Sequence, residues 1–546
     1  MFSRAAYYLK MSAGLARLQR SPRLHDPVDA IRDQMRHREE RFLAMARSAL
    51  DRGFYRELFT FAGCSYADLE YGVRRDGIRA TLVRLAAAGV YVTHDEFRGR
   101  TDLVRGNLHI PWNAKSLDNP TGRGTNPQST SGSTGKPFVT SVSNDYLLYR
   151  DGHELLEIRA LDSFSRPHVI VAPVLPVSWP IRRQVIWHRL GISTDRWFAL
   201  AAREGDIVPR VVTRLMIAQT RLLGAAARYP EHLPPNDFTP VADCLARYRA
   251  TKRLAFVRTM PSLATRIAAA ARENGWDISG SMFSVSGEPL TALKRQAIES
   301  SGAEVYSFYG ATEFGHFGHP CRTMRDGDRV HLFEDSTMLV SHRADGAEQH
   351  GLFVTSLLPL APRTLINVGV DDSAVIEPAV CDCEYQRLGF TMQARAIFSY
   401  GKVTTQGTTI EAAELADLIE AALPARFGGA SGDYQLAEVD GAAQSELLLR
   451  VSPRLRNVDP VLVRDFFLDR LGGILGGRFS RQLWEFSAGL RVAVEEPEHT
   501  STGKVHPVRL RSLAFDHVSP DRTSAVQARG EARRSPGTRT PRPARG

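Results

Sequence analysis

Lysine is scarce in this 546-residue chain, because only seven of its 70 Lys and Arg residues are lysines. Arginine supplies the remaining positive side chains, so the position of each lysine is informative. Three of the seven, Lys136, Lys402 and Lys504, directly follow a glycine. Two of these Gly-Lys pairs end loops rich in Ser and Thr, at residues 129–137 and 500–504. Such loops suit phosphate oxygens, so we expect different parts of the chain to reach for one anionic ligand.

Cysteine and long apolar runs are also scarce. The five cysteines argue against a disulfide-stabilised scaffold. The best candidate for a bilayer-crossing run, around residues 169–179, is broken by Pro173 and Pro176. Arg4 and Lys10 interrupt any signal-peptide pattern at the N-terminus. We therefore expect a cytoplasmic protein without a membrane partner.

The net charge of +10 is concentrated at the C-terminus. Residues 517–546 carry seven arginines against Asp521 and Glu531, which gives 7 − 2 = +5, or half of the excess. This segment has almost no large apolar residues, so we predict that residues 516–546 form a disordered basic tail. Weak contact of the tail with RNA or lipid headgroups is an alternative, but we expect neither nucleic acid nor a membrane as a partner.

The order of apolar and helical patterns predicts an α/β protein with more than one domain. We expect a helical N-terminal part of the large domain over residues 1–105, followed by a ligand-binding core over residues 106–394. A hinge at 395–406 leads to a small C-terminal α+β domain over residues 407–515. Within residues 140–390 the alternation favours a largely parallel sheet. The strands expected in it are residues 169–172, 254–257, 282–285 and 305–308, with helices at 261–274 and 291–300.

Two expected strands end in loops with ligand-binding residue types. The first is followed by Gly287-Glu288-Pro289, and the second by Tyr309-Gly310-Ala311-Thr312-Glu313. The second loop offers a ring for stacking, a hydroxyl for phosphate and a carboxylate suited to Mg²⁺. Downstream, Asp371 and Asp372 are alternative acceptors for ribose hydroxyls.

The Ser/Thr-rich loop at residues 129–137 reads in full Ser129-Thr130-Ser131-Gly132-Ser133-Thr134-Gly135-Lys136-Pro137. Its glycine spacing and the proline after the lysine distinguish it from a Walker A loop. In their order, this loop, the two strand-end loops and Thr502-Gly503-Lys504 resemble the motifs of the adenylate-forming superfamily, which includes acyl- and aryl-CoA synthetases. Within that superfamily the chain looks closest to the phenylacetate-CoA ligase branch. The resemblance covers roughly residues 40–510.

The resemblance implies a large multi-layer adenylation domain, a small lid domain and roles for individual residues. The 129–137 loop would hold the ATP phosphates, and Gly287, Glu288 and Pro289 would belong to the adenine pocket. Tyr309 and Gly310 would lie near adenine, Thr312 would meet the α-phosphate, Glu313 would bind Mg²⁺ and Asp372 would hold the ribose. Arg395 would open the hinge, and Lys504 would reach the reacting groups from the lid.

The resemblance also implies an activity. ATP would convert an aryl or acyl acid to an acyl-adenylate, and CoA would then accept the acyl group as a thioester. The segment Ala394–Tyr400 lacks the acidic residues usual in the family's hinge. Two alternatives therefore stay open: an adenylating enzyme that loads a carrier protein or another nucleophile, and a nucleotide-binding pseudoenzyme. The identity of the acid and the oligomeric state are not specified by the sequence.

A cluster of soft ligands suggests a second cofactor. Thiolates and imidazoles are zinc-type ligands, and some members of the branch carry a similar cysteine set. We predict a structural zinc bound by Cys321, Cys381, Cys383 and one histidine, for which we select His319. The alternative is reduced thiols without a ligand. Trp187 and neighbouring tryptophans either line an acyl pocket or belong to the core, and we favour the core.

Overall fold

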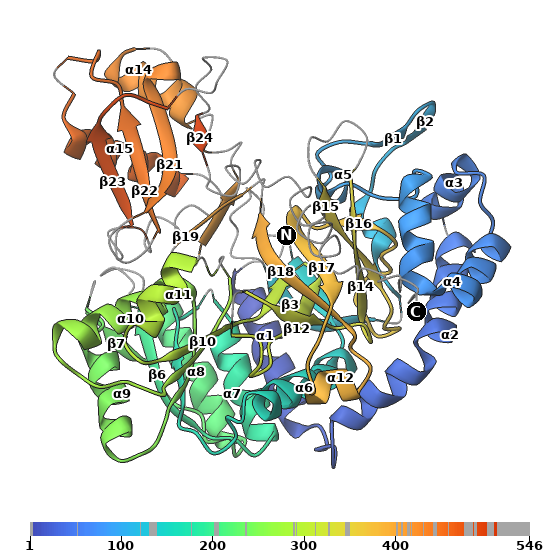
Figure 1. The fold of residues 1–546 in the computed structure, drawn as a ribbon, viewed down its shortest axis with the longest axis horizontal. Helices are drawn as coiled ribbons and strands as arrows, with labels where there is room; N and C mark the ends of the chain where they lie inside the picture. Colours follow the sequence, from blue (N-terminus) through green and yellow to red (C-terminus); the bar gives the residue numbers. More distant parts are fainter. Residues whose placement is uncertain are drawn as a thin grey trace, which may run out of the picture.

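The computed structural model describes residues 4–509, with gaps in the following list. The gaps are residues 52, 121, 130–138, 176, 201–206, 235–236, 288–289, 291, 312, 326–327, 344–349, 400–401, 406–407, 412–414, 416–417, 430, 441–444, 457, 474–483, 485–488 and 499–506. Figure 1 shows a large body built from the first 400 residues and a smaller C-terminal unit, drawn in orange, to one side of it. The expected architecture, an α/β protein with a large domain and a smaller C-terminal domain, is confirmed.

Helices dominate the N-terminal part, as the sequence predicts. They are α1 (Arg4–Arg20), α2 (Val28–Asp51), α3 (Phe54–Phe61), α4 (Tyr66–Ala87) and α5 (His94–Arg98). Two of these helices begin with capping boxes. The side chains of Ser65 and Thr93 each accept a hydrogen bond from the backbone N–H three residues later, and their own backbone N–H groups donate to the carboxylate of that later residue. Among the described helices, none combines the length and the hydropathy that a membrane-spanning segment requires.

A six-stranded parallel sheet forms the centre of the large body, with strand order β10-β9-β8-β5-β6-β7. Its strands are β5 (His168–Val171), β6 (Thr194–Leu200), β7 (Glu231–Leu233), β8 (Phe256–Thr259), β9 (Met282–Val285) and β10 (Glu304–Ser307). Its helices are α6 (Asn144–Ala160), α7 (Trp179–Arg189), α8 (Ile207–Leu222), α9 (Thr239–Ala250), α10 (Pro261–Glu273) and α11 (Ala292–Glu299). The four predicted strands are thus found within two residues of their expected positions.

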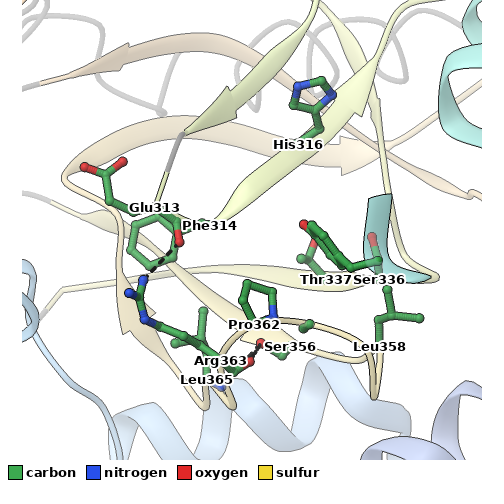
Figure 2. A pocket seen from close by; sticks show the side chains of 12 residues that line it. Glu313, Phe314, His316, Ser336, Thr337, Ser356, Leu358, Pro362, Arg363 and Leu365 are labelled. Carbon is green, nitrogen blue, oxygen red and sulfur yellow. Dashed lines mark hydrogen bonds between the residues drawn. The ribbon is translucent and has the colours of Figure 1, made fainter. Parts of the chain in front are cut away.

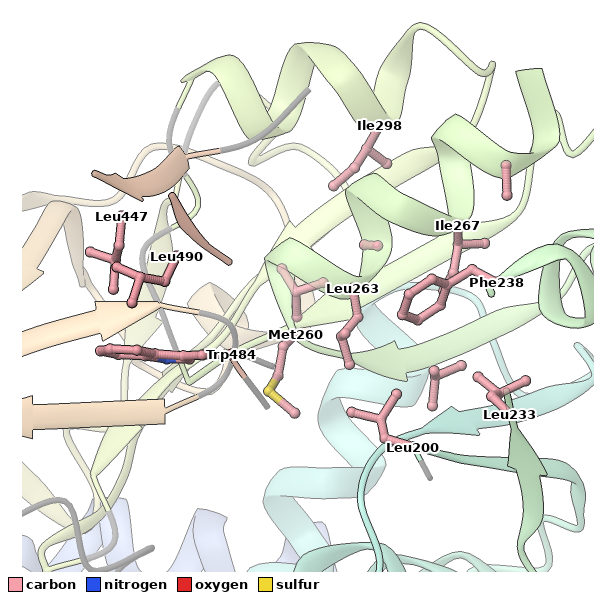
Figure 3. Packing of buried hydrophobic residues seen from close by; sticks show 14 of the residues in the cluster. Leu200, Leu233, Phe238, Met260, Leu263, Ile267, Ile298, Leu447, Trp484 and Leu490 are labelled. Atoms are coloured by element: carbon pink, nitrogen blue, oxygen red, sulfur yellow. The ribbon is translucent and has the colours of Figure 1, made fainter. Parts of the chain in front are cut away.

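Apolar side chains from both faces of this sheet form the core. Figure 3 shows Leu200 and Leu233 below Leu263 and Ile267 of α10, with Phe238 beside Leu263. On the other face, Trp187 and Trp197 are completely buried. The preference for these tryptophans as core residues is confirmed.

The parallel sheet is smaller than predicted. Beyond Ser307 every described strand of the large body pairs antiparallel with its neighbours, up to Ser399. One sheet has the order β11-β12-β13-β18-β17 and another the order β14-β15-β16. The bounds are β11 (Tyr309–Ala311), β12 (Gly315–His319), β13 (Val330–Leu332), β14 (Thr337–His342), β15 (Gly351–Ser356), β16 (Val368–Gly369), β17 (Asp372–Pro378) and β18 (Met392–Ser399), with α12 (Glu384–Arg387) between the last two. Short loops between consecutive strands permit antiparallel pairing, whereas parallel strands need a crossover helix.

The remaining strands form smaller sheets. Two hairpins, β1 (Leu103–Arg105) with β2 (Leu108–Ile110) and β3 (Arg123–Ser129) with β4 (Val139–Val142), flank the short helix η1 (Ala114–Leu117). Two more strands, β19 (Lys402–Thr405) and β20 (Thr408–Glu411), pair after β18. The C-terminal unit contains η2 (Leu418–Ala422), α14 (Leu423–Phe427), η3 (Ser431–Asp433), β21 (Tyr434–Asp440), β22 (Ser445–Val451), α15 (Pro460–Gly473), β23 (Leu490–Val494) and β24 (Val508–Arg509).

His168 in β5 gives the fold a dependence on pH. It is 1% exposed, and its Nε2 lies 3.0 Å from the carbonyl oxygen of Ser163. Burial lowers the pKa of this imidazole to about 4 from an ordinary value of 6.5. Below pH 6.5 the His168 imidazole is therefore protonated in the unfolded chain but stays neutral in the folded chain down to about pH 4. The free energy of unfolding falls as the pH drops from 6.5 towards 4.

We expect the His168→Gln variant to lose this component of the pH dependence. At pH 5 the wild type should have lost on the order of 2 kcal/mol through His168 alone, relative to pH 7.5. Thermal melting of both proteins across this pH range measures the difference. The control is His25→Gln, which replaces an exposed histidine. Equal pH profiles for wild type and His168→Gln would contradict the prediction.

Candidate functional site

Tyr309 and Asp372 meet although they begin the two edge strands of one sheet. Tyr309 is the first residue of β11 and Asp372 the first of β17, at opposite ends of the order β11-β12-β13-β18-β17. The Tyr309 hydroxyl nevertheless donates to Asp372 Oδ2 over 2.7 Å. The sheet must therefore curl until its edges approach, and this closure brings together two segments that lie 63 residues apart in the sequence.

The neighbouring aspartate, Asp371, faces elsewhere. Its Oδ2 lies 3.7 Å from His94 Nδ1 of α5, and its backbone has a positive φ of 67°. The backbone turn at Asp371 places the two consecutive carboxylates in different surroundings. Of the two alternatives from the sequence, Asp372 is the one that lies against the tyrosine of the Tyr-Gly-Ala-Thr-Glu loop.

Glu313 lies in the turn between β11 and β12, beside two arginines. Its Oε1 is 3.2 Å from Nη1 of Arg98 at the end of α5, and its carbonyl oxygen accepts from Arg363 Nη1 over 3.2 Å. Figure 2 shows the Arg363 guanidinium reaching towards the Glu313 segment, with a dashed line for this hydrogen bond. Gly310 permits this turn, because a Cβ there would lie 2.8 Å from the Gly315 carbonyl oxygen. The carboxylate expected to bind Mg²⁺ is thus paired with a cation in this state of the protein.

The pocket in Figure 2 lies beside Glu313. It is lined by Tyr146 of α6, by His316 of β12 and by the loops that follow β13 and β15, with the lining residues Phe314, Ser336, Thr337, Ser356, Leu358, Ala361, Pro362, Arg363 and Leu365. Burial lowers the pKa of His316 well below its ordinary value, so its imidazole is neutral at pH 7. The wall is mostly apolar but includes the charged side chains of Glu313 and Arg363, and the cavity of about 20 Å³ holds no more than a water molecule in this conformation.

A buried charge network underlies this region. Arg258 of β8 forms two bonds to Glu157 of α6, with Nη1–Oε1 at 3.0 Å and Nη2–Oε2 at 2.5 Å. The Ser284 hydroxyl of β9 adds a 2.7 Å bond to Glu157 Oε1. Both members of the ion pair are at most 1% exposed, so losing one would strand a buried charge. These residues are not predictable from the sequence, because no local pattern around Glu157 indicates a pairing with an arginine 101 residues away.

The phosphate-type loop is held at its base. Its first residue, Ser129, pairs with Val139 at the ends of β3 and β4, so residues 130–138 connect two adjacent antiparallel strands. Those residues, including Lys136, lie outside the described part of the chain, as do Glu288, Pro289, Thr312 and Lys504. The roles that the sequence suggests for them remain predictions.

Gly287 and Arg395 are described. Gly287 follows β9 with a positive φ of 93°, a conformation that glycine adopts readily. Arg395 lies within β18, where its Nε donates to Glu377 Oε1 of β17 over 2.9 Å. Arg395 thus lies inside a paired strand that continues to Ser399.

Three cysteines and a histidine converge beside β13, the central strand of the five-stranded sheet. Sγ of Cys321, Sγ of Cys381, Sγ of Cys383 and a ring nitrogen of His331 lie within 4.8 Å of one another. His331 Nε2 is 3.3 Å from the Cys381 sulfur and 3.1 Å from the Cys383 sulfur. The three predicted cysteines are brought together, but the selection of His319 is wrong. His319 lies instead against Glu157 and His316.

His319 in β12 and His331 in β13 are directly paired neighbours, so both side chains project from the same face of the sheet. Of the two, His331 is the one that lies beside the sulfurs of Cys381 and Cys383. Hydrogen bonds from Cys383 and His331 lower the pKa of the Cys321 thiol, which favours a thiolate in the cluster. Three sulfurs and one imidazole in this arrangement form a donor set for tetrahedral zinc.

Among known proteins, only solved structures are similar to this chain. No protein-family model matches the chain, and no curated protein matches it either. Among solved structures, it is similar to 2-hydroxyisobutyryl-CoA ligase in complex with 2-HIB-AMP and CoA in the thioesterification state. The identity is 15%, the match covers 92% of each chain, and the TM-score is 0.53. The same ligase in its postadenylation state is matched at 15% identity over 91% of this chain and 92% of that chain, with a TM-score of 0.45. From the thioesterification-state match we conclude that the chain has the fold of an acid–CoA ligase over nearly its full length.

Proposed function

We propose that this protein is an AMP-forming ligase that activates a carboxylic acid with ATP and transfers the acyl group to CoA. The observation that carries the proposal is the Tyr309–Asp372 pair, which the curled sheet places together in a fold shared with an acid–CoA ligase. Asp372 would accept the ribose hydroxyls, and Tyr309 would contact the adenine. The acid would bind beside Glu313, where the small pocket would have to widen to admit it.

Charge neutralisation is the central chemical requirement. A carboxylate attacks the α-phosphate of ATP slowly because both groups are anions. Lys504, Thr312 and the amides of the 129–137 loop would stabilise the developing charge, and Lys136 would hold the departing pyrophosphate. The Glu313 carboxylate is an oxygen donor of the kind that binds Mg²⁺, and it would have to separate from Arg98 to do so. The bound ion would neutralise phosphate charge.

A pair of assays tests the proposal. Acid-dependent exchange of pyrophosphate into ATP reports adenylate formation, and CoA-dependent release of AMP reports transfer to the thiol. A panel of aryl and acyl acids should contain at least one that gives both signals. Absence of exchange with every acid in the panel would favour the pseudoenzyme.

A carrier protein or another nucleophile is the second candidate acceptor. The acceptor is a separate question from adenylation, because the hinge segment Ala394–Tyr400 has no acidic residue and Arg395 is paired with Glu377 inside β18. We propose that the hinge falls within residues 395–406, after the paired part of β18, and that residues 407–515 form the lid. Exchange without CoA-dependent AMP release would identify this alternative.

We further propose that the cluster of Cys321, His331, Cys381 and Cys383 binds a structural zinc ion. Cys321 follows β12, His331 belongs to β13, and the Cys-Asp-Cys segment precedes α12. A metal at this point would fasten the sheet that carries Tyr309 and Asp372 to α12. It would therefore act through stability rather than through the reaction.

The Asp372→Asn variant is expected to raise the KM for ATP by about 10- to 100-fold, since it weakens charge-assisted bonds to the ribose. The matched control is Asp371→Asn, which removes the same charge one residue away, beside His94. Steady-state kinetics with ATP as the varied substrate distinguishes the two. A larger effect from Asp371→Asn would reverse the assignment.

A further inference from the structure

Helix α8 buries Met216 and Ile217 against the protein, as a surface helix normally does, but it also exposes a second set of aliphatic side chains. Val208, Leu215 and Leu222 recur every seven residues and are 65%, 63% and 87% exposed. Thr213 and Thr220 also recur every seven residues but are 0% and 2% exposed. The exposed apolar residues therefore form one line along the helix, and the interior of the protein does not account for them.

Cations border this line. Arg214 and Arg221 occupy the positions directly before Leu215 and Leu222 and follow the same seven-residue spacing, so they run beside the apolar line. Both arginines are exposed, and among the described residues neither forms an ion pair with a carboxylate; Arg221 Nη1 donates to the Ala227 carbonyl oxygen over 2.8 Å. The helix itself contains no acidic residue. The acidic residues nearest in sequence, Glu204 and Asp206, precede its first turn.

The neighbouring helix α1 also has exposed cations and an exposed apolar side chain. Gln219 of α8 donates to the Ser12 carbonyl oxygen over 3.0 Å, and Gln19 of α1 donates to the Thr220 carbonyl oxygen over 2.9 Å. These bonds hold the two helices side by side. Helix α1 also contains no acidic residue, and it exposes Leu9 at 72% together with Lys10 and Arg20.

We propose that the exposed face of α8, bordered by α1, binds the surface of a membrane that contains anionic phospholipids. An interfacial helix combines an apolar line with flanking Lys and Arg, lies in the plane of the interface and inserts only its apolar face. Two adjacent helices with cations and no carboxylates match the uniform negative charge of such a surface. A protein partner is less well matched, because the exposed line is aliphatic and protein-binding hot spots are rich in Trp and Tyr.

This surface differs from a membrane-spanning segment, and it changes the expectation of a protein without a membrane partner. The proposal concerns attachment at the headgroups, which the overall composition of the chain does not reveal. It does not depend on the proposed ligase activity, since α8 contributes no residue to the pocket beside Glu313.

Co-sedimentation of the full-length protein with vesicles tests the proposal. We expect binding to vesicles of phosphatidylglycerol and phosphatidylcholine, weakening as salt is added, and no binding to phosphatidylcholine alone. The double variant Arg214→Gln/Arg221→Gln should bind about 25-fold more weakly, at about fivefold for each cation lost. Leu215→Ser/Leu222→Ser should also bind more weakly while keeping the salt dependence.

Matched controls separate this surface from general effects. Arg74→Gln/Arg247→Gln removes two exposed arginines elsewhere, and Val461→Ser/Leu462→Ser removes two exposed apolar side chains of α15. Both controls should bind vesicles like the wild type. Three outcomes would overturn the proposal: no vesicle binding, binding abolished by deletion of residues 517–546 but kept in the α8 variants, or a dimer that dissociates in Leu215→Ser/Leu222→Ser without any lipid effect. Unchanged melting temperatures confirm that the variants fold.

Discussion

Replacing Lys504 with alanine is expected to slow acyl-adenylate formation by about a hundredfold to a thousandfold. The lysine belongs to the Ser/Thr-rich segment 500–504 near the end of the proposed lid. Its ammonium group would neutralise the α-phosphate while two anions react, and a neutral side chain leaves that charge unbalanced. Acid-dependent exchange of pyrophosphate into ATP measures this step directly.

The same variant should spare the second step. If Lys504 acts only on the phosphate, thioester formation from a supplied acyl-adenylate and CoA should stay within about threefold of the wild-type rate, a difference well below one cation's effect on adenylation. Lys252→Ala serves as the control, because it removes a lysine from an exposed turn after α9. Wild-type exchange in Lys504→Ala would disprove the assigned role. Equal losses in both steps would indicate a lid that no longer folds.

The parallel half of the fold was predictable because its local and global signals agree. Each β–α unit there has a short apolar run followed by an amphipathic helix, as in Met282–Val285 before Ala292–Glu299. The antiparallel half has similar apolar runs but lacks the helices between them. The apolar runs alone predicted parallel strands in this half as well. Their direction depends on the connections between strands, which are too short here for parallel crossovers.

The candidate site was predictable in its residue types but not in its geometry. The motif order identifies Tyr309 and both aspartates, yet the choice between Asp371 and Asp372 depends on the backbone turn at Asp371. The zinc-type cluster shows the same limit. Sequence proximity favours His319 as the partner of Cys321, whereas in the fold His331 of the neighbouring strand lies beside Cys381 and Cys383.

Loss of the metal from the cysteine cluster is expected to lower the melting temperature by about 3 °C or more. The cluster joins three chain segments, at Cys321, His331 and residues 381–383, so its ion would cross-link the sheet. Removing one ligand or the metal is expected to destabilise the fold by about 3 kcal/mol or more, and each kcal/mol shifts the melting temperature by about 1 °C in a chain this long, because the entropy of unfolding grows with length. Cys383→Ser and chelator-treated wild type should therefore melt at similar, lowered temperatures.

Elemental analysis and two other cysteines make the test specific. The wild type purified without chelator should contain about one zinc per chain, the number that a single four-ligand site holds, and Cys383→Ser should contain almost none. Cys64→Ser and Cys244→Ser change the two cysteines outside the cluster and should retain both the metal and the melting temperature, apart from packing effects of Cys244. His319→Gln should keep its zinc, whereas His331→Gln should lose it. A metal-free wild type that melts like its Cys383→Ser variant would instead show that these are reduced thiols held together by hydrogen bonds.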